Sequence, residues 1–369
     1  MSRPSPTMIA TRLLALSCVA LLGACDSDSD GVDTDGGPET EASVSGTGGE
    51  SSATTTTADS EGVTSDDTSV DPSGSSGSDA TDPTQGTDPT DPTAPTDSET
   101  GDDPGAPRVP ELQGECPEFV LGEGDNPAEL SFPVGLGSRR ALVWYDPSQG
   151  GGGPLVFSFH GSGGDPTNAI ATVSNDAIED ILANGGMVIA PFAEPSAATE
   201  WFLVTGSAQN DLVMMDSMVS CAVNDGGIDP YRIHGVGFSA GALHIGIASI
   251  LRSSYMASTV AYSGGIYSEA ASENPDATPS SLIFHGGASD VVSGLSFSAA
   301  AQLYFNVITE RGGEAVICDH GTGHGYPDNE TGIWRRRDAY NFLLDHPFGV
   351  DPHPYAGGLP EWTPPYCSG

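Results

Sequence analysis

Short apolar runs alternate with stretches of helical character through most of the chain, and this alternation limits the possible folds more than any other feature. The apolar runs are rich in Val, Ile, Leu and Phe, as strands buried on both faces of a sheet are. Six such runs cover residues 155–161, 187–193, 232–239, 258–265, 281–287 and 314–321, and two earlier runs at 130–134 and 140–145 are expected to form an entry hairpin. Helices are predicted near 167–184, 209–223, 240–252, 296–311 and 335–345. This order predicts a mostly parallel central sheet with helices on both faces, with ligands bound beyond the carboxyl ends of its strands.

The first 25 residues have the pattern of an export signal. Arg3 and Arg12 come before the apolar run LLALSCVALLGAC, which is short for a membrane span. The run ends in LGAC at 22–25, which resembles the bacterial lipobox and implies cleavage before Cys25 and lipid attachment to its sulfur. Residues 1–25 are therefore predicted to be a lipoprotein signal peptide, and the protein to be exported and anchored through Cys25 to a membrane of the cell envelope. Ordinary secretion is the alternative.

Residues 26–107 consist mainly of Asp, Glu, Ser, Thr, Gly and Pro, with repeats such as TDPTQGTDPTDPTAPTD. A segment with so few apolar side chains cannot bury enough surface to offset the entropy of ordering it, so we predict a disordered acidic tether. Its first part, DSDSDGVDTDGG, begins like a calcium-binding loop. Gly37 stands where such a loop carries its bidentate glutamate, so no calcium site is expected.

The remaining segment, 108–369, has the length of a single α/β domain. The whole chain has 51 acidic and 11 basic residues, a formal net charge of −40, and its basic residues are all arginines. So acidic a protein is a poor partner for nucleic acid or for anionic lipid headgroups. The charge does not identify a substrate.

Four cysteines fall in the predicted domain, namely Cys116, Cys221, Cys318 and Cys367. In an exported protein four cysteines predict two disulfides, for which three pairings are possible. Chain order favours Cys116 with Cys221 and Cys318 with Cys367, and the second of these would tie the C-terminal tail back to the domain.

Ser239 lies between Gly237 and Gly241, at the point where a predicted strand gives way to a predicted helix. A strand, a sharp turn and a helix are the context that the GxSxG nucleophile elbow requires, because only glycine relieves the crowding around the serine. A plain structural turn is the alternative. The context predicts that Ser239 is a nucleophile.

Two later residues complete a catalytic arrangement, because a serine hydroxyl needs a base and the base needs an orienting carboxylate. Asp290 follows one predicted strand after a short glycine turn, and His324 lies in a Gly-rich loop after the next. The order Ser, Asp, His is the order of α/β-hydrolases. Asp290 could instead cap the helix near 296, and His320 is a rival for the base. No metal or cofactor is expected, because the spacing of Cys318, His320 and His324 matches no closed zinc site.

Acyl transfer also needs N–H donors for the oxyanion of the tetrahedral intermediate. The backbone N–H of Ala240, directly after the nucleophile, is one candidate. The other is the N–H of Ser162, in the glycine turn HGSGG that follows an early strand.

Together these blocks resemble a known group of enzymes. HGSGGD, QNDLVMMDSMVSCAVNDGGIDPYRIHGVGFSAG, FHGGASDVV and GTGHGYP, spread over roughly 110–345, resemble the secreted polyhydroxybutyrate depolymerase-like and feruloyl-esterase-like hydrolases. The resemblance implies an α/β-hydrolase fold and ester hydrolysis by Ser239, Asp290 and His324. It also implies that Trp201 contributes an aromatic acyl site, unless it is a core tryptophan, and that Tyr326 lies where the group commonly has tryptophan. Gly241-Ala242 replaces the usual double glycine.

Two classes of function remain open at this point. The first is an extracytoplasmic serine esterase acting on polyhydroxyalkanoate, feruloyl or acetyl esters, with a serine peptidase as its variant. The second is a non-catalytic surface binding protein that keeps the hydrolase fold, because a fold alone does not fix a function. An ordered set of nucleophile, acid and base favours the esterase.

Overall fold

The computed structural model describes residues 105–194, 201, 208–327 and 336–369. The predicted signal peptide at 1–25, the lipidation site Cys25 and nearly all of the acidic tether at 26–107 lie outside these residues. None of the helices described is both long enough and apolar enough to cross a bilayer.

Nine strands in the described part of the chain form one sheet, in the order β1-β2-β4-β3-β5-β6-β7-β10-β11. The six central strands, β4, β3, β5, β6, β7 and β10, run parallel to one another. At the edges, β1 pairs antiparallel with β2, β2 with β4, and β11 with β10. Their bounds are β1 (Ala128–Val134), β2 (Gly137–Tyr145), β3 (Leu155–Phe159), β4 (Met187–Pro191), β5 (Ile233–Phe238), β6 (Ser258–Tyr262), β7 (Ser280–His285), β10 (Ala315–Asp319) and β11 (Cys367–Ser368).

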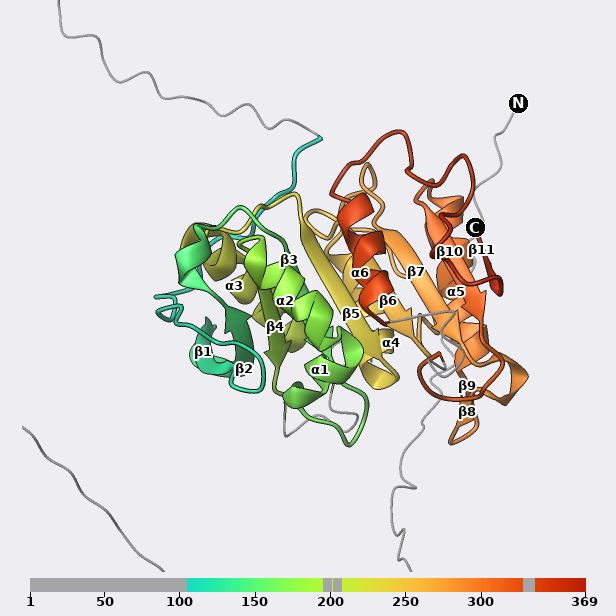
Figure 1. Cartoon of the computed structure of the whole chain (residues 1–369), viewed down its shortest axis with the longest axis horizontal. Helices are drawn as coiled ribbons and strands as arrows, with labels where there is room; N and C mark the ends of the chain where they lie inside the picture. The colour runs from blue at the N-terminus through green and yellow to red at the C-terminus, as the bar shows by residue number, and fades with distance from the viewer. Residues whose placement is uncertain (1–104, 195–200, 202–207, 328–335) are drawn as a thin grey trace, which may run out of the picture. The chain divides into compact units, whose positions relative to one another are not determined.

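Helices cover both faces of this sheet (Figure 1), as the sequence predicted. They are α1 (Ala169–Thr172), α2 (Asn175–Ala183), α3 (Ala208–Asn224), α4 (Ala240–Leu251), α5 (Phe297–Glu310) and α6 (Arg336–Asp345). Side chains alternate between the faces along each strand. On β3, Leu155 and Phe157 share a core cluster with α3 and α4, whereas Val156 between them packs with α2 and α6. The predicted fold class, an α/β-hydrolase fold with a mostly parallel sheet, is confirmed.

Two local features differ from the sequence prediction. The helix predicted at 167–184 is interrupted by Ser174, whose φ of 82° ends α1 and whose hydroxyl caps α2. A short hairpin of β8 (Val291–Val292) and β9 (Leu295–Ser296) separates Asp290 from α5. The 3₁₀ turns η1 (Pro147–Gln149), η2 (Pro166–Asn168) and η3 (Gly287–Ser289) complete the described elements.

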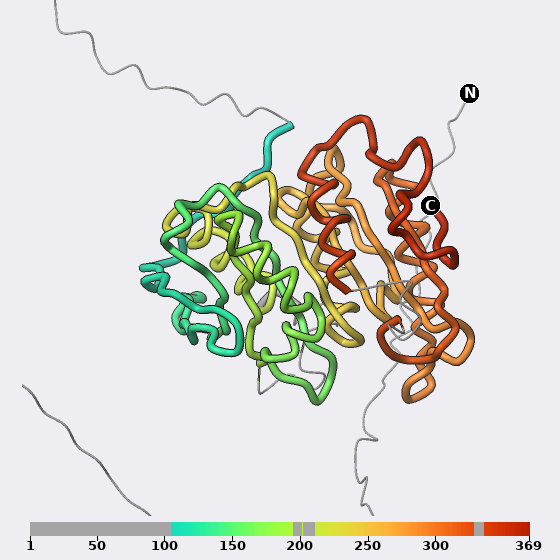
Figure 2. Tube along the Cα trace, in the orientation of Figure 1, coloured from blue at the N-terminus to red at the C-terminus, as the bar shows by residue number. Residues whose placement is uncertain are grey.

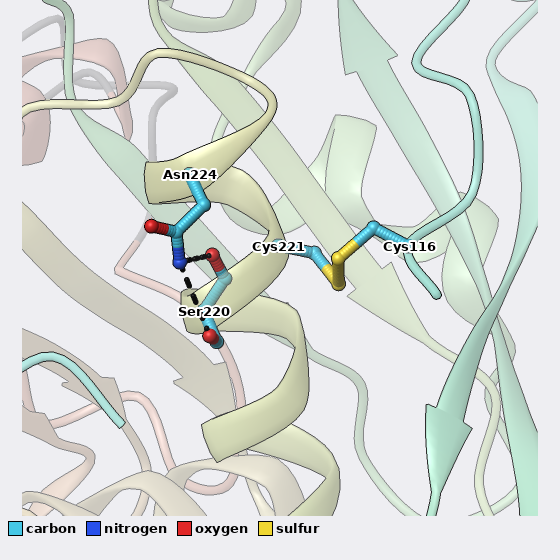
Figure 3. The surroundings of a disulfide bond; sticks show 4 residues. All are labelled: Cys116, Ser220, Cys221 and Asn224. Atoms are coloured by element: carbon cyan, nitrogen blue, oxygen red, sulfur yellow. Dashed lines mark hydrogen bonds between the residues drawn. A yellow bond between two sulfur atoms is a disulfide. The ribbon is translucent and has the colours of Figure 1, made fainter. Parts of the chain in front are cut away.

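Both disulfides have the pairing that chain order favoured. Cys116 is bonded to Cys221 on α3 (Figure 3), across a sequence separation of 105 residues. Cys318 on β10 is bonded to Cys367 on β11, and the two strands pair antiparallel at these residues. In Figure 2 the dark red C-terminal segment returns beside the orange β10 segment. Two disulfides are consistent with an extracytoplasmic protein.

Candidate active site

The loops after β5, β7 and β10 meet at the carboxyl edge of the sheet. In the strand order, β6 alone lies between β5 and β7, and β10 is next to β7. Because these strands are parallel, their carboxyl ends lie at the same edge. The three loops carry Ser239, Asp290 and His324, so residues that are far apart in the sequence meet there.

Ser239 occupies a strained turn between β5 and α4. Its φ of 52° and ψ of −118° are unusual for a residue with a side chain. The flanking glycines allow the turn to pack closely against neighbouring backbone. A Cβ at Gly237 would lie 2.4 Å from the Gly241 carbonyl oxygen, and a Cβ at Gly241 would lie 2.1 Å from the Phe159 carbonyl oxygen. This is the backbone that a nucleophile elbow requires.

The imidazole of His324 contacts both of its expected partners. Its Nε2 lies 2.9 Å from the Ser239 Oγ, and its Nδ1 lies 2.7 Å from the Asp290 Oδ1. An ionised carboxylate only accepts hydrogen bonds, so Nδ1 donates to Asp290 and Nε2 is left to accept from the serine hydroxyl. That tautomer is the one a general base for Ser239 needs.

Asp290 is held in its ionised form although its side chain has 0% exposure. Burial raises the pKa of this carboxyl, but hydrogen bonds from His324, from the Gly286 N–H and from Ser263 outweigh burial and hold the pKa below its ordinary value. The Gly286 N–H donates to Oδ2 at 2.9 Å. Asp290 does not cap α5, because the N-cap of that helix is Ser296.

The structure separates the two histidines that the sequence left as rivals. His320 Nδ1 lies 2.6 Å from the Thr322 Oγ1 within its own loop, and burial lowers its pKa. His324 lies against Ser239 instead. The ring centroids of Phe297 and Phe238 are 4.4 and 5.3 Å from that of His324, so apolar side chains flank the imidazole and fix its plane.

The proposed oxyanion donors lie on two segments that approach each other. Ala240 is the first residue of α4, where a helix leaves backbone N–H groups without intrahelical partners. Ser162 is exposed and follows Gly161, at which a Cβ would come within 3.1 Å of the Ser239 Cβ. The HGSGG turn therefore lies directly against the turn that carries Ser239.

A cavity of about 280 Å³ opens beside this turn. It is lined by Gly161, Ser162, Gly163, Gly164, Asn168, Ala171, Phe238 and Tyr326. Tyr326 stacks on Phe238 with ring centroids 4.5 Å apart, and its hydroxyl lies 2.9 Å from the Thr172 Oγ1. Tyr326 thus forms part of the wall of this cavity.

Trp201 has a different position from the one expected of an acyl-site aromatic. Its side chain is fully buried, its Nε1 donates to the His160 carbonyl oxygen at 2.8 Å, and it packs edge-on against Phe159. The structure therefore places it in the core, which was the alternative expected for it. We do not retain Trp201 as a substrate-binding residue.

Sequence reasoning missed two residues at this site, Ser263 and Phe297. Ser263 follows β6, hydrogen-bonds Gly325 and helps to lower the pKa of Asp290, and Phe297 begins α5 next to His324. The sequence feature that could have identified Ser263 is its position directly after a predicted strand. Within the described ranges, no three His, Cys, Asp or Glu side chains are grouped as metal ligands would be.

No family model and no curated protein matches the chain. Solved structures do match it. One is a complex of a pOPH variant with DMSO, which is 19% identical with a TM-score of 0.53 and covers 69% of this chain and 95% of its own. Another is native sOPH, which is 18% identical with a TM-score of 0.53 and covers 69% of this chain and 96% of its own. Such identities show a shared fold.

Proposed function

We propose that this chain is a serine esterase with the α/β-hydrolase fold. The proposal is carried by one observation, the hydrogen-bonded series from the Ser239 Oγ through the His324 imidazole to the buried Asp290 carboxylate. A serine, a base and an orienting acid in this geometry are the parts that acyl transfer needs. The fold, the strained elbow and the adjacent cavity agree with it.

In the proposed reaction, His324 Nε2 takes the hydroxyl proton as the Ser239 Oγ attacks the carbonyl carbon of the ester. The negative charge that develops on the carbonyl oxygen is stabilised by the N–H groups of Ser162 and Ala240. The tetrahedral intermediate then expels the alcohol, which takes the proton from His324 and leaves an acyl-serine. Water attacks the acyl group with its proton passing to His324, and the carboxylic acid leaves as the serine is protonated again.

The surroundings of Ser239 favour an ester with apolar groups. Phe238 and Tyr326 form aromatic walls of the cavity. On the hairpin after Asp290, Val291, Val292 and Leu295 are 46%, 41% and 50% exposed, and so offer apolar surface to a substrate. Polyhydroxyalkanoate, feruloyl and acetyl esters fit this description.

A panel of p-nitrophenyl esters, hydroxycinnamate methyl esters and hydroxybutyrate oligomers tests the proposal. Ser239→Ala, Asp290→Asn and His324→Ala should each fold and lose most turnover, and the serine variant alone should approach the triple variant because the three residues act as one unit. His320→Ala is the matched control and should keep most activity. A fluorophosphonate should label Ser239 alone.

Other outcomes would select other functions. Labelling that survives Ser239→Ala would overturn the assignment of the nucleophile. Turnover of amide but not ester substrates would select the peptidase variant. If no substrate turns over and no probe reacts, the binding-protein alternative replaces the esterase.

We also propose that the enzyme acts outside the cytoplasm, anchored by a lipid on Cys25. The LGAC sequence at 22–25 and the two disulfides support this location. Cys25→Ser should release the protein from membranes or leave it unprocessed. Wild-type protein that stays in the aqueous phase of a detergent separation and carries no lipid by mass spectrometry would refute the anchor.

A further inference from the structure

One buried hydroxyl, that of Ser263, holds the loop that carries His324. Ser263 is the first residue after β6 and has 0% exposure. Its Oγ accepts the Gly325 N–H at 3.2 Å and lies 3.0 Å from the Gly325 carbonyl oxygen. Ser263 also helps to hold the pKa of the Asp290 carboxyl below its ordinary value. Because Gly325 directly follows His324, Ser263 holds the backbone next to the base.

The backbone of Ser263 is strained. Its φ of 46° lies in the left-handed region, which is costly for residues other than glycine. Its N–H donates to the Phe284 carbonyl oxygen near the end of β7. The next residue, Gly264, packs closely against α4, since a Cβ there would lie 2.1 Å from the Ala242 Cβ. Glycine would adopt this φ without strain, but it would bring no hydroxyl.

We propose that Ser263 is a positioning residue for His324, the base of the esterase reaction. The inference rests on the proposed function, because it assigns Asp290 and His324 the roles given above. The hydroxyl has a single proton. It accepts from the Gly325 N–H and donates to the Gly325 carbonyl oxygen. By holding both backbone groups of Gly325, it fixes the segment that presents the preceding residue, His324, to Ser239 and Asp290.

Two substitutions at Ser263 separate the effect of losing the hydroxyl from the effect of relieving the backbone strain. Ser263→Ala removes the hydroxyl and keeps the Cβ, and Ser263→Gly removes both the hydroxyl and the strain. Both variants should lower kcat on a p-nitrophenyl ester by about 10- to 100-fold, the size of effect that a small misplacement of catalytic groups causes, with KM nearly unchanged. Ser249→Ala is the matched control, because Ser249 is equally buried and bonds Gly246 and Tyr304 away from the site.

The pH profile distinguishes positioning from a purely structural role. Ser263 helps to lower the pKa of the Asp290 carboxyl, so loss of its hydroxyl favours the protonated form of the acid and base pair. The acid limb of kcat/KM should therefore move to higher pH in both Ser263 variants and stay in place in Ser249→Ala. The low-field proton NMR signal of the His324 Nδ1–H should also shift or broaden in both.

Each contrary outcome is decisive. Wild-type kcat, pH profile and proton signal in both variants would overturn the proposal while leaving the esterase function intact. A loss of stability alone, or full activity in Ser263→Gly with loss in Ser263→Ala, would assign the residue to folding or strain instead. If the wild-type protein hydrolyses no ester, the proposed function fails, and the proton signal then decides the positioning role by itself.

Discussion

A histidine buried in the core should make this protein sensitive to acid. His244 on α4 is fully buried, and its ring lies 4.6 Å from that of Phe159 and 5.5 Å from that of Trp201, measured between centroids. Burial is the largest influence on its pKa and lowers it to about 4; Asp211 raises the pKa and Arg139 lowers it further. Neither ring nitrogen has a hydrogen-bond partner among the described residues.

The sign of the effect follows from the two pKa values. The unfolded chain takes up a proton near the ordinary value of 6.5, whereas the folded protein does so only near 4. Between these values the unfolded state binds more protons, so the free energy of unfolding falls as the pH falls from 6.5 toward 4. At pH 5 the loss is about 2 kcal/mol, from about 1.4 kcal/mol per pH unit below 6.5. His234, with a pKa of about 3, adds a similar loss.

The test is urea unfolding of wild-type protein and His244→Phe at pH 8 and pH 5. Effects of the substitution that do not depend on pH cancel when the drop between the two pH values is compared. That drop should be about 2 kcal/mol smaller in His244→Phe than in wild type. Phe159→Leu, in the same cluster, should lower stability equally at both pH values. An unchanged drop in His244→Phe would refute the reasoning that this ring is buried and neutral.

Three other predictions follow from packing and connectivity. Gly241→Ala should lower both ester turnover and the urea midpoint, because the new Cβ would lie 2.1 Å from the Phe159 carbonyl oxygen; a fully active variant would contradict the elbow geometry. Replacing Cys116 and Cys221 by serine removes a disulfide that closes a loop of about 100 residues, so the free energy of unfolding should fall by about 4–5 kcal/mol. A fall below about 1 kcal/mol would show that the disulfide does not constrain the unfolded chain in this way. Tyr326→Ala should widen the cavity and raise kcat/KM for longer acyl chains relative to short ones, whereas Tyr326→Phe should keep the wild-type preference.

The local features of the site could be predicted because each depends on neighbours in the chain. Gly237 and Gly241 around Ser239 indicated the elbow, and the structure places Ser239 at a φ of 52° in a turn between a strand and a helix. Alternation of apolar runs predicted β3 to β7, because buried parallel strands are continuous apolar segments. Asp290 and His324 were predicted as site residues because each follows a strand. In a parallel sheet the carboxyl ends of the strands lie at one edge, and ligands bind there.

The sequence by itself determined the order of elements, the mostly parallel sheet and which residues end its strands. The tertiary structure alone decided which of those residues touch. It set His324 rather than His320 against Ser239, placed Trp201 in the core, and brought Ser263 to Gly325. The physical reason is that backbone pattern fixes where a strand ends, whereas the contacts of a side chain beyond that end depend on how loops from other strands pack against it. Those loops are separated in the chain by tens of residues, and no local pattern encodes their distances.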